Sequence, residues 1–371
     1  MAGYQIPWVF TNTRTGLTIP FLTASINFGR ATYMDVYNGG GLIFTINNNA
    51  NQAGSIQMGD SIRVTAISGA YDVGFWVDEI QCQDYPGGTG FSTATIVCSD
   101  GMVRLGRRLL NNQALTLAYS GEQAVQMSDV AQSPGITRLG TGQSLVSATT
   151  YTGAPMQRLN QLVNTERGVM RCRGYEVLFV ARDQLNYYGA SLPSISFGRT
   201  AGATQIGYQQ FSRIGLGLNF MNTVAVTPTG GAEQLSTNTA SVTAYGSAYY
   251  SLQTEDSTNA QGLGLANWLS NSQADPSAER YEIQFSDRSQ TQNLVTRLLP
   301  TLIQPYIYDL SYRIPGAGSD TNTKAVMEGF TIDISQSDST FSISLSPATY
   351  YQFFTLDSAT LGILDTSRLG W

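Results

Sequence analysis

Short apolar runs that alternate with polar residues fill the first 100 residues, and this two-residue period is typical of half-buried strands. The runs are rich in Ile, Val, Thr and Phe, and turn-forming clusters such as Gly39-Gly40-Gly41 and Asn47-Asn48-Asn49 separate them. We expect strands at 22–28, 42–47, 61–67, 73–82 and 92–98. Short strands with regular turns predict a β-sandwich or a β-barrel.

The period changes after residue 100. Apolar residues three and four positions apart predict helices at 102–110, 122–130 and 156–163. The stretch 133–153 between them is polar and rich in Gly, Ser and Thr, so we expect it to be a linker.

A second mixed region begins near Gly168. Helices are expected at 259–269 and at 292–299, where Pro300 should end the second of them. Strands are expected at 176–181, 214–220, 223–227, 241–245, 248–253, 281–286, 306–313, 326–335 and 340–345.

Together these elements predict a mainly β fold with inserted helices, of the α+β class. We divide the chain into an N-terminal β-domain (1–100), a helical connector and linker (101–167), a second β-rich domain with helices (168–346) and a C-terminal arm (347–371). One short repeat links the two β regions: Ser25-Ile26-Asn27-Phe28-Gly29-Arg30 nearly recurs as Ser194-Ile195-Ser196-Phe197-Gly198-Arg199. A shared origin of the two regions would place these segments in equivalent strands, although six residues also match by chance.

The composition is poor in charge and in lysine. Charged residues make up 12% of the chain, against a typical value of about 25%. Lys324 is the only lysine, while there are 20 tyrosines. Protein interfaces are depleted in Lys and enriched in Tyr and Arg, so much of the surface is expected to face other subunits. A genome-wide bias against lysine codons is the competing explanation.

The charge pattern also excludes several classes of partner. The net charge is −6 and no basic run occurs, so sequence-specific nucleic-acid binding is not expected. No stretch of 18 apolar residues predicts a membrane span, and residues 1–10 do not form a secretory signal.

The chain contains no histidine, which removes the most common general base and zinc ligand. The acidic pairs Asp78-Glu79 and Glu255-Asp256 could serve a glycosidase, but solvated turns are the favoured interpretation. The three cysteines match no zinc spacing. Cys82 and Cys98 flank the turn 84–90 and could face each other, although buried free thiols are favoured. We expect no cofactor, no metal and no enzymatic activity.

A series of short motifs, weak singly, stands in a fixed order along the chain. The motifs are Ile26-Asn27-Phe28-Gly29-Arg30, segment 58–64, Val73-Gly74-Phe75-Trp76-Val77-Asp78, Val97-Cys98-Ser99-Asp100, Arg158-Leu159-Asn160, Leu265-Ala266-Asn267-Trp268-Leu269 and segment 356–369. Their order resembles that in the phage minor tail proteins, or tail-tip hub (baseplate) family of long-tailed phages, and segment 58–64 fits the pattern GD-x-(I/V)-R-(V/I) of that family. The resemblance covers nearly the whole chain, except 186–207, which does not align.

The resemblance implies a structural virion protein at the tail tip, where three copies form a ring that closes the tail tube. Each copy would carry two tube-like β-domains joined by the connector. The implied partners are identical copies, a distal tail or tail tube protein, the tape-measure protein and a fibre or spike protein. One rival is a receptor-binding adhesin, whose aromatic-rich turns Tyr187-Tyr188 and Tyr249-Tyr250 could bind sugars, although contact with the core or with other subunits is the favoured use of these residues. The other rival is a cell-wall hydrolase fused to a tail part.

The C-terminal arm carries the candidate assembly residues. Asp357 and Asp365 each follow a leucine, and each suits a turn or a helix N-cap. Such a segment cannot bury its leucines alone, so it should dock on its own protomer or, as we hypothesise, on a neighbouring copy or another tail protein. The residues concerned are Leu356, Asp357, Leu361, Leu364, Asp365, Arg368 and Trp371.

Overall fold

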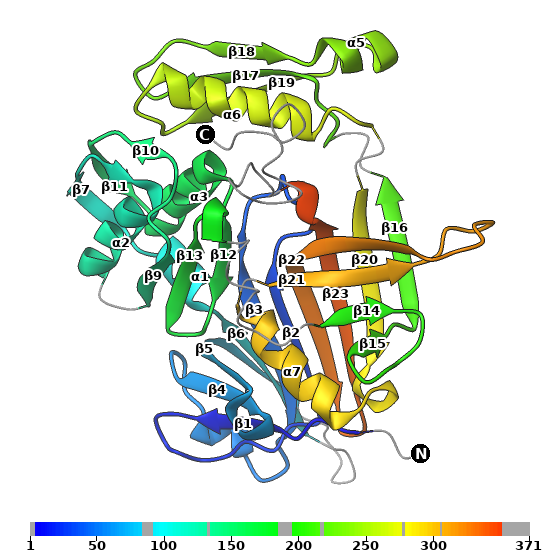
Figure 1. Ribbon diagram of the computed structural model, residues 1–371. Helices are drawn as coiled ribbons and strands as arrows, with labels where there is room; N and C mark the ends of the chain where they lie inside the picture. Colours follow the sequence, from blue (N-terminus) through cyan, green and yellow to red (C-terminus); the bar gives the residue numbers. More distant parts are fainter. Residues whose placement is uncertain are drawn as a thin grey trace.

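A large curled sheet, a lobe of helices and short strands beside it, and a smaller lobe above make up the molecule (Figure 1). The computed structural model describes residues 4–83, 92–131, 134–184, 195–215, 219–276, 279–304 and 306–350. The expectation of a mainly β fold with inserted helices is confirmed. No helix in these ranges is long and apolar enough to span a membrane.

The N-terminal strands follow the alternation in the sequence. All five predicted strands are present, and Trp8–Asn12 (β1) adds a sixth that the sequence reading missed. In β4, for example, Ile62, Val64 and Ala66 are buried while the residues between them are not. The strands are antiparallel and comprise β2 (Thr23–Gly29), β3 (Asn38–Asn47), β4 (Ser61–Ala66), β5 (Tyr71–Gln83) and β6 (Thr93–Ser99).

The strands of the second half continue the same sheet. The long strand β22 (Thr321–Ser335) pairs with β2, with β21 (Ile307–Tyr312) and with β23 (Ser339–Pro347). The strands of the two halves therefore join in one sheet of 13 strands among the described residues. Its remaining members are β14 (Ser196–Gly198), β15 (Gln205–Gly207), β16 (Gln210–Gly215) and β20 (Glu279–Ser286).

The main hydrophobic core lies between this sheet and α7 (Gln292–Leu302). Leu294, Leu298 and Leu302 of the helix are buried in it, and each buried leucine contributes about 1.5–3 kcal/mol. The helix continues past Pro300, so the predicted end at that residue is wrong. Its last turn stays helical because Leu299 and Leu302, on either side of the proline, are both fully buried.

The lateral lobe contains three predicted helices, now bounded as α1 (Gly101–Gly106), α2 (Ser120–Ala131) and α3 (Pro155–Glu166). Helix α1 ends early because Leu110 already belongs to β7. The prediction of a linker at 133–153 is wrong for the described residues from 134 on: segments 135–139, 145–146 and 149–153 form strands that pair with neighbours in the lobe. These strands and their partners are β7 (Leu110–Leu115), β8 (Ala118–Tyr119), β9 (Gly135–Leu139), β10 (Leu145–Val146), β11 (Thr149–Gly153), β12 (Val169–Cys172) and β13 (Glu176–Val180).

The upper lobe packs α6 (Asn259–Ser272) on a sheet of three strands. Segment 241–245, predicted as a strand, is part of α5 (Thr239–Tyr245), because the Asn238 side chain caps it by accepting from the Ser241 N–H at 3.0 Å. Of the strand predicted at 214–220, Ile214 and Gly215 lie in strand β16, residues 219 and 220 do not lie in a strand, and 216–218 fall outside the described residues. The lobe's strands are β17 (Thr223–Pro228), β18 (Gln234–Thr237) and β19 (Tyr249–Thr254).

Five short 3₁₀ turns complete the described elements. They are η1 (Gln52–Ser55), η2 (Ile67–Gly69), η3 (Arg182–Gln184), η6 (Asp287–Ser289) and η7 (Ala348–Tyr350).

The proposed boundary at residue 168 falls inside the lateral lobe, since β13 pairs with β9 as well as with β12. The division into two tube-like domains stays a prediction. The repeat does not occupy equivalent strands: Ile26 lies in the long antiparallel strand β2, whereas Phe197 lies in β14, which is parallel to both of its neighbours. This pair of segments therefore gives the duplication hypothesis no support.

All three cysteines are free thiols, and Cys82 is exposed while Cys98 and Cys172 are buried. Cys82 lies opposite Ala94 and Cys98 lies opposite Val77 in the β5–β6 register, so the two thiols do not face each other. The expectation of buried free thiols is confirmed for Cys98 and Cys172 and wrong for Cys82.

Candidate functional surface

The predicted assembly residues Leu356, Asp357, Leu361, Leu364, Asp365, Arg368 and Trp371 lie outside the described residues. The described chain leads up to them through η7. There Tyr350 is only 7% exposed, and its ring lies 5.6 Å from the ring of Tyr33. The start of the arm is thus fixed to the body of the protein.

One face of the large sheet is polar and hollowed. The alternation is clearest in β23, where Phe341, Ile343 and Leu345 are buried and the intervening residues are partly exposed. The polar residues of neighbouring strands meet in register because each strand keeps the same period. One row across five strands runs Asn27, Thr331, Ser342, Gln284 and Gln210.

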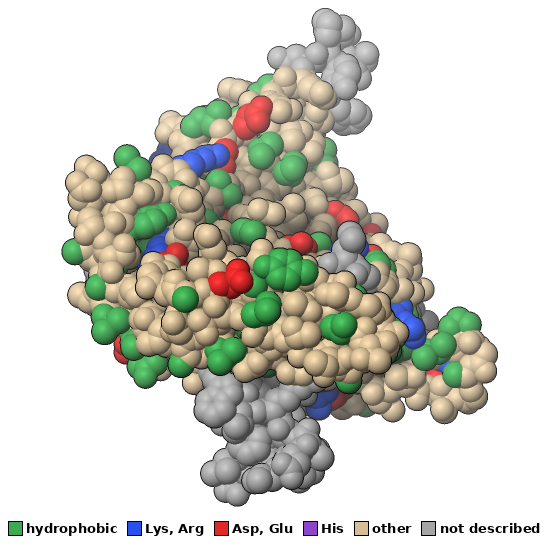
Figure 2. Space-filling view, turned by 90° about the horizontal axis from the view of Figure 1, so that it is seen from above, with side chains coloured by type: hydrophobic (Ala, Val, Ile, Leu, Met, Phe, Trp, Pro, Cys, Tyr) green, Lys and Arg blue, Asp and Glu red, His purple; other side chains and the backbone are tan. Residues whose placement is uncertain are grey.

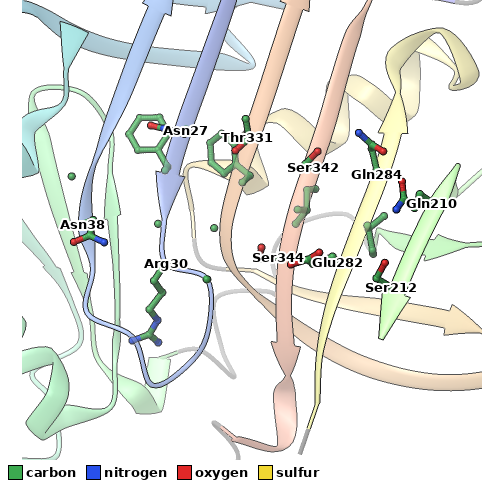
Figure 3. Close-up of a pocket in the computed structure, with 18 residues that line it drawn as sticks. Asn27, Arg30, Asn38, Gln210, Ser212, Glu282, Gln284, Thr331, Ser342 and Ser344 are labelled. Atoms are coloured by element: carbon green, nitrogen blue, oxygen red, sulfur yellow. The ribbon is translucent and has the colours of Figure 1, made fainter. Parts of the chain in front are cut away.

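Figure 3 shows these side chains projecting into a shallow cavity of about 520 Å³. A parallel row adds Ser344, Glu282 and Ser212, and Asn38 lies at the rim on β3. Next to the first row, the Ser25 hydroxyl donates to Asp333 at 2.7 Å. The surface is therefore built from hydroxyl and amide groups carried by six adjacent strands.

This polar face carries little charge. Arg30 and Glu282 are the charged residues that line the cavity. Glu282 is neutralised by Arg280 at 2.9 Å, and the Arg30 side chain is only 3% exposed and turned toward Glu328. Such a surface offers hydrogen bonds to a passing or bound chain, but it provides no cluster of cations for phosphate.

The joint between the two halves of the sheet lies at one end of the cavity. Gly29 has a φ of +91° and faces Gly329 across the β2–β22 pair. A Cβ on Gly329 would lie 2.7 Å from the Phe28 carbonyl oxygen, so the close approach requires glycine. The extra residue at Glu328, a β-bulge relative to β23, turns its carboxylate toward Arg30 at 2.8 Å.

Aromatic rings surround this ion pair. The guanidinium carbon of Arg30 lies 4.3 Å from the centre of the Tyr37 ring and 5.7 Å from that of Tyr33. Tyr33 in turn contacts Trp268 of α6, with ring centres 6.2 Å apart. The sheet, the upper lobe and the start of the arm thus meet around Tyr33.

The acidic pairs behave differently from each other. Asp78 and Glu79 lie within strand β5, so the expected solvated turn is wrong there, and the Asp78 side chain, 17% exposed, pairs with Arg107. Asp256 is only 1% exposed, so the expectation is wrong there as well, and burial raises its pKa to about 6. Glu255 beside it pairs with Arg158 at 2.6 Å. Burial also raises the pKa of Asp100 to about 6, although the Gly40 and Val103 N–H groups donate to its carboxylate.

Within the described ranges, no group of three or more Cys, Asp or Glu side chains could hold a metal ion. The polar rows were missed in the sequence, although each strand shows its share of them as alternate Ser, Thr, Asn and Gln. What they can do is form a continuous, nearly neutral surface for contact.

The arrangement has counterparts among solved structures. A tail protein from Neisseria meningitidis MC58 superposes with a TM-score of 0.65 and 10% identity, covering 94% of this chain and 98% of that one. The chain shares the fold of phage tail proteins. A 43 kDa tail protein of prophage MuSo2 from Shewanella oneidensis gives 0.59 and 12%, with 93% and 98% covered.

A third similar structure, the c3393 protein of E. coli, is described as a type VI secretion component that resembles the T4 phage tail proteins gp27 and gp5. Its TM-score is 0.52 at 8% identity, over 93% of this chain and 77% of that one. No protein-family model and no curated protein matches the sequence. These likenesses extend over almost the whole chain and establish its fold.

Proposed function

We propose that this chain is a structural protein of a phage virion and that it works at the tail tip as a hub. The observation that carries the proposal is the likeness over 94% of the chain to a tail protein. The ordered sequence motifs, which resemble those of tail-tip hub proteins, favour the hub over other parts of a tail. The protein would act by assembly and not by catalysis.

The hub would be a ring of three identical copies with the polar face turned toward the bore. A nearly neutral wall of Ser, Thr, Asn and Gln suits a channel through which DNA passes without sticking. Strand β16 pairs only with β20 among the described residues, so its other edge presents backbone groups to a neighbour. The ring would contact a distal tail or tail tube protein, the tape-measure protein and a fibre or spike protein.

Labelled virions test this proposal directly. An affinity tag on this chain, imaged by electron microscopy on virions of the phage that encodes it, should appear at the tip of the tail. Mass measurement of the purified chain at high concentration should give a trimer, whose interfaces bury at least about 1,200–2,000 Å². Label on the capsid, or absence of the chain from virions, would contradict the proposal.

A receptor-binding adhesin at the same tip is the second candidate. Tyr249 is 61% exposed on the open face of the β17–β19 sheet, where Ser251 lies in the same strand. Figure 2 views the molecule from above and shows a surface with few charged side chains. Tyr187-Tyr188 lies outside the described residues. The isolated protein should then retain host cells or their glycans, and Tyr249→Ala should abolish the retention.

A further inference from the structure

A second cavity, of about 550 Å³, lies where strands β14, β21 and β22 meet η7. Strands β14, β21 and β22 form its wall with Ser196, Asp309, Asn322 and Lys324, and Ala348 and Thr349 of η7 close one side. Figure 1 shows η7, in red, directly above β22. The cavity therefore adjoins the point where the described chain gives way to residues 351–371.

The only lysine of the chain stands in this cavity. Lys324 is 61% exposed at its side chain and pairs with Asp309, itself 53% exposed, at 2.8 Å. An ion pair so open to solvent contributes little, because water screens both charges. A second carboxylate could thus share the ammonium group or replace Asp309 at small cost.

The arm supplies carboxylates, and its first five residues beyond η7 include no typical turn former. Asp357 and Asp365 outnumber Arg368, so residues 351–371 are net acidic. The segment Tyr351-Gln352-Phe353-Phe354-Thr355 contains no Gly, Pro, Asn or Asp, the residues that most often form turns. Five residues reach at most about 17 Å when fully extended. This length is enough to carry Asp357 away from the cavity beside η7 of its own copy.

We propose that the cavity receives the arm of a neighbouring copy, with the carboxylate of Asp357 or Asp365 bound by Lys324. The inference rests on the proposed ring, and it assigns the receptor for the arm. Each copy would place its arm in the cavity of the next copy and receive the arm of the preceding one, so that the contacts close in a ring. The apolar floor at Leu310 and Ala348 would lie under the arm, while Ser196 and Asn322 would hydrogen-bond its backbone.

The single lysine makes the test unusually specific. A water-soluble carbodiimide joins an amine to a carboxylate without a spacer, so apart from the chain's amino terminus every link involves Lys324. The assembled full-length protein should give covalent dimers and trimers on a denaturing gel. Mass spectrometry should find Lys324 linked to Asp357 or Asp365, and a mixture of ¹⁴N and ¹⁵N protein should show that the link joins two chains.

Two variants set the controls. Lys324→Arg keeps the charge but cannot be coupled, so its oligomeric bands should disappear while its assembly persists. The link from Lys324 to Asp309 within one chain should form in the wild type and reports that the reagent works. If that link forms alone, or if the arm is linked only within its own chain, the proposal is overturned.

The outcome separates this inference from the proposed function. Tagged full-length chain located at the tail tip without interchain links would overturn the arm receptor and leave the hub standing. Interchain links in a protein that never enters virions would support the receptor and remove the hub.

Discussion

The Nε of Arg30 lies 2.8 Å from a carboxylate oxygen of Glu328, and both side chains are almost fully buried where β2 meets β22. These two residues come from opposite ends of the chain, and β2–β22 is the pairing that joins the first six strands to the rest of the sheet. The ion pair therefore holds the two halves of the polar face in one register.

Glu328→Gln should strongly destabilise the protein, because it leaves the Arg30 charge buried without its partner. Breaking one partner of a buried pair typically costs about 3–5 kcal/mol of unfolding free energy. Lys324→Gln, which breaks the exposed pair with Asp309, should cost no more than about 1 kcal/mol. Urea unfolding of both variants checks this, and equal losses would show that the buried pair has no special role.

Gly329→Ala should destabilise the fold through packing alone, since the new Cβ meets the Phe28 carbonyl at 2.7 Å. Overpacking of this kind costs about 1–3 kcal/mol. Gly318→Ala is the matched control, because nothing lies within 4 Å of its Cβ position. A control variant as unstable as Gly329→Ala would argue against the close crossing of β2 and β22.

Asp256 should make the protein more stable as the solution becomes more acid between pH 6 and 4. Its pKa is raised from 3.8 to about 6, so the folded state holds the proton more tightly than the unfolded state. The stability it contributes is complete below about pH 4 and is lost as pH rises through 6, and two pKa units correspond to at most about 3 kcal/mol.

Asp256→Asn removes this titration, so the variant should gain stability over the wild type at pH 7 and lose the advantage at pH 4. Asp100 titrates in the same direction and Asp60, whose pKa is lowered to about 2, in the opposite one, so only the difference between the two proteins isolates Asp256. Urea unfolding of both proteins from pH 4 to pH 7 measures this difference in unfolding free energy. A difference that does not change with pH would contradict the assignment.

A bulky residue on the polar face should block function and leave folding intact. Ser342→Trp projects into the cavity of Figure 3, and a substitution at such a partly exposed site usually changes stability by no more than about 0.5 kcal/mol. Thr237→Trp, exposed on β18 of the upper lobe, is the control. Infectious titre should fall for the first variant alone if the face lines the bore, and equal titres would remove that assignment.

The sequence predicts most of those elements whose structure is determined by neighbouring residues, and it fails for those determined by distant partners. The five N-terminal strands follow from alternation alone, because one face of each is buried. The helix at α5 was missed because Val242 and Thr243 favour strands, whereas the Asn238 cap decides the matter. The strands of 133–153 were missed because their polar composition hides partners such as β13, which lie elsewhere in the chain.

The polar face shows the same limit. Asn27 and Thr331 are each visible as polar residues in an alternating strand, but their contact joins residues about 300 positions apart. No local sequence pattern specifies the pairing of β2 with β22. The close approach of Gly29 and Gly329 and the Arg30–Glu328 ion pair stabilise it, and these residues meet only in the folded chain. The Gly-Arg motif was noticed in the sequence without its partner.

Deletion of residues 353–371 gives the last prediction. Tyr350 is already buried against Tyr33, so the described body should remain folded, with unchanged circular dichroism and urea midpoint. When the truncated chain replaces the full-length chain during assembly, it should fail to enter virions. The leucines of the arm can be buried only by docking, and each buried leucine contributes about 1.5–3 kcal/mol. The double substitution Asp357→Asn and Asp365→Asn keeps the leucines and removes the charges, so it should weaken assembly less than the deletion. Normal incorporation of the truncated chain would show that the arm is dispensable, and unfolding of the truncated monomer would show that it packs on its own protomer.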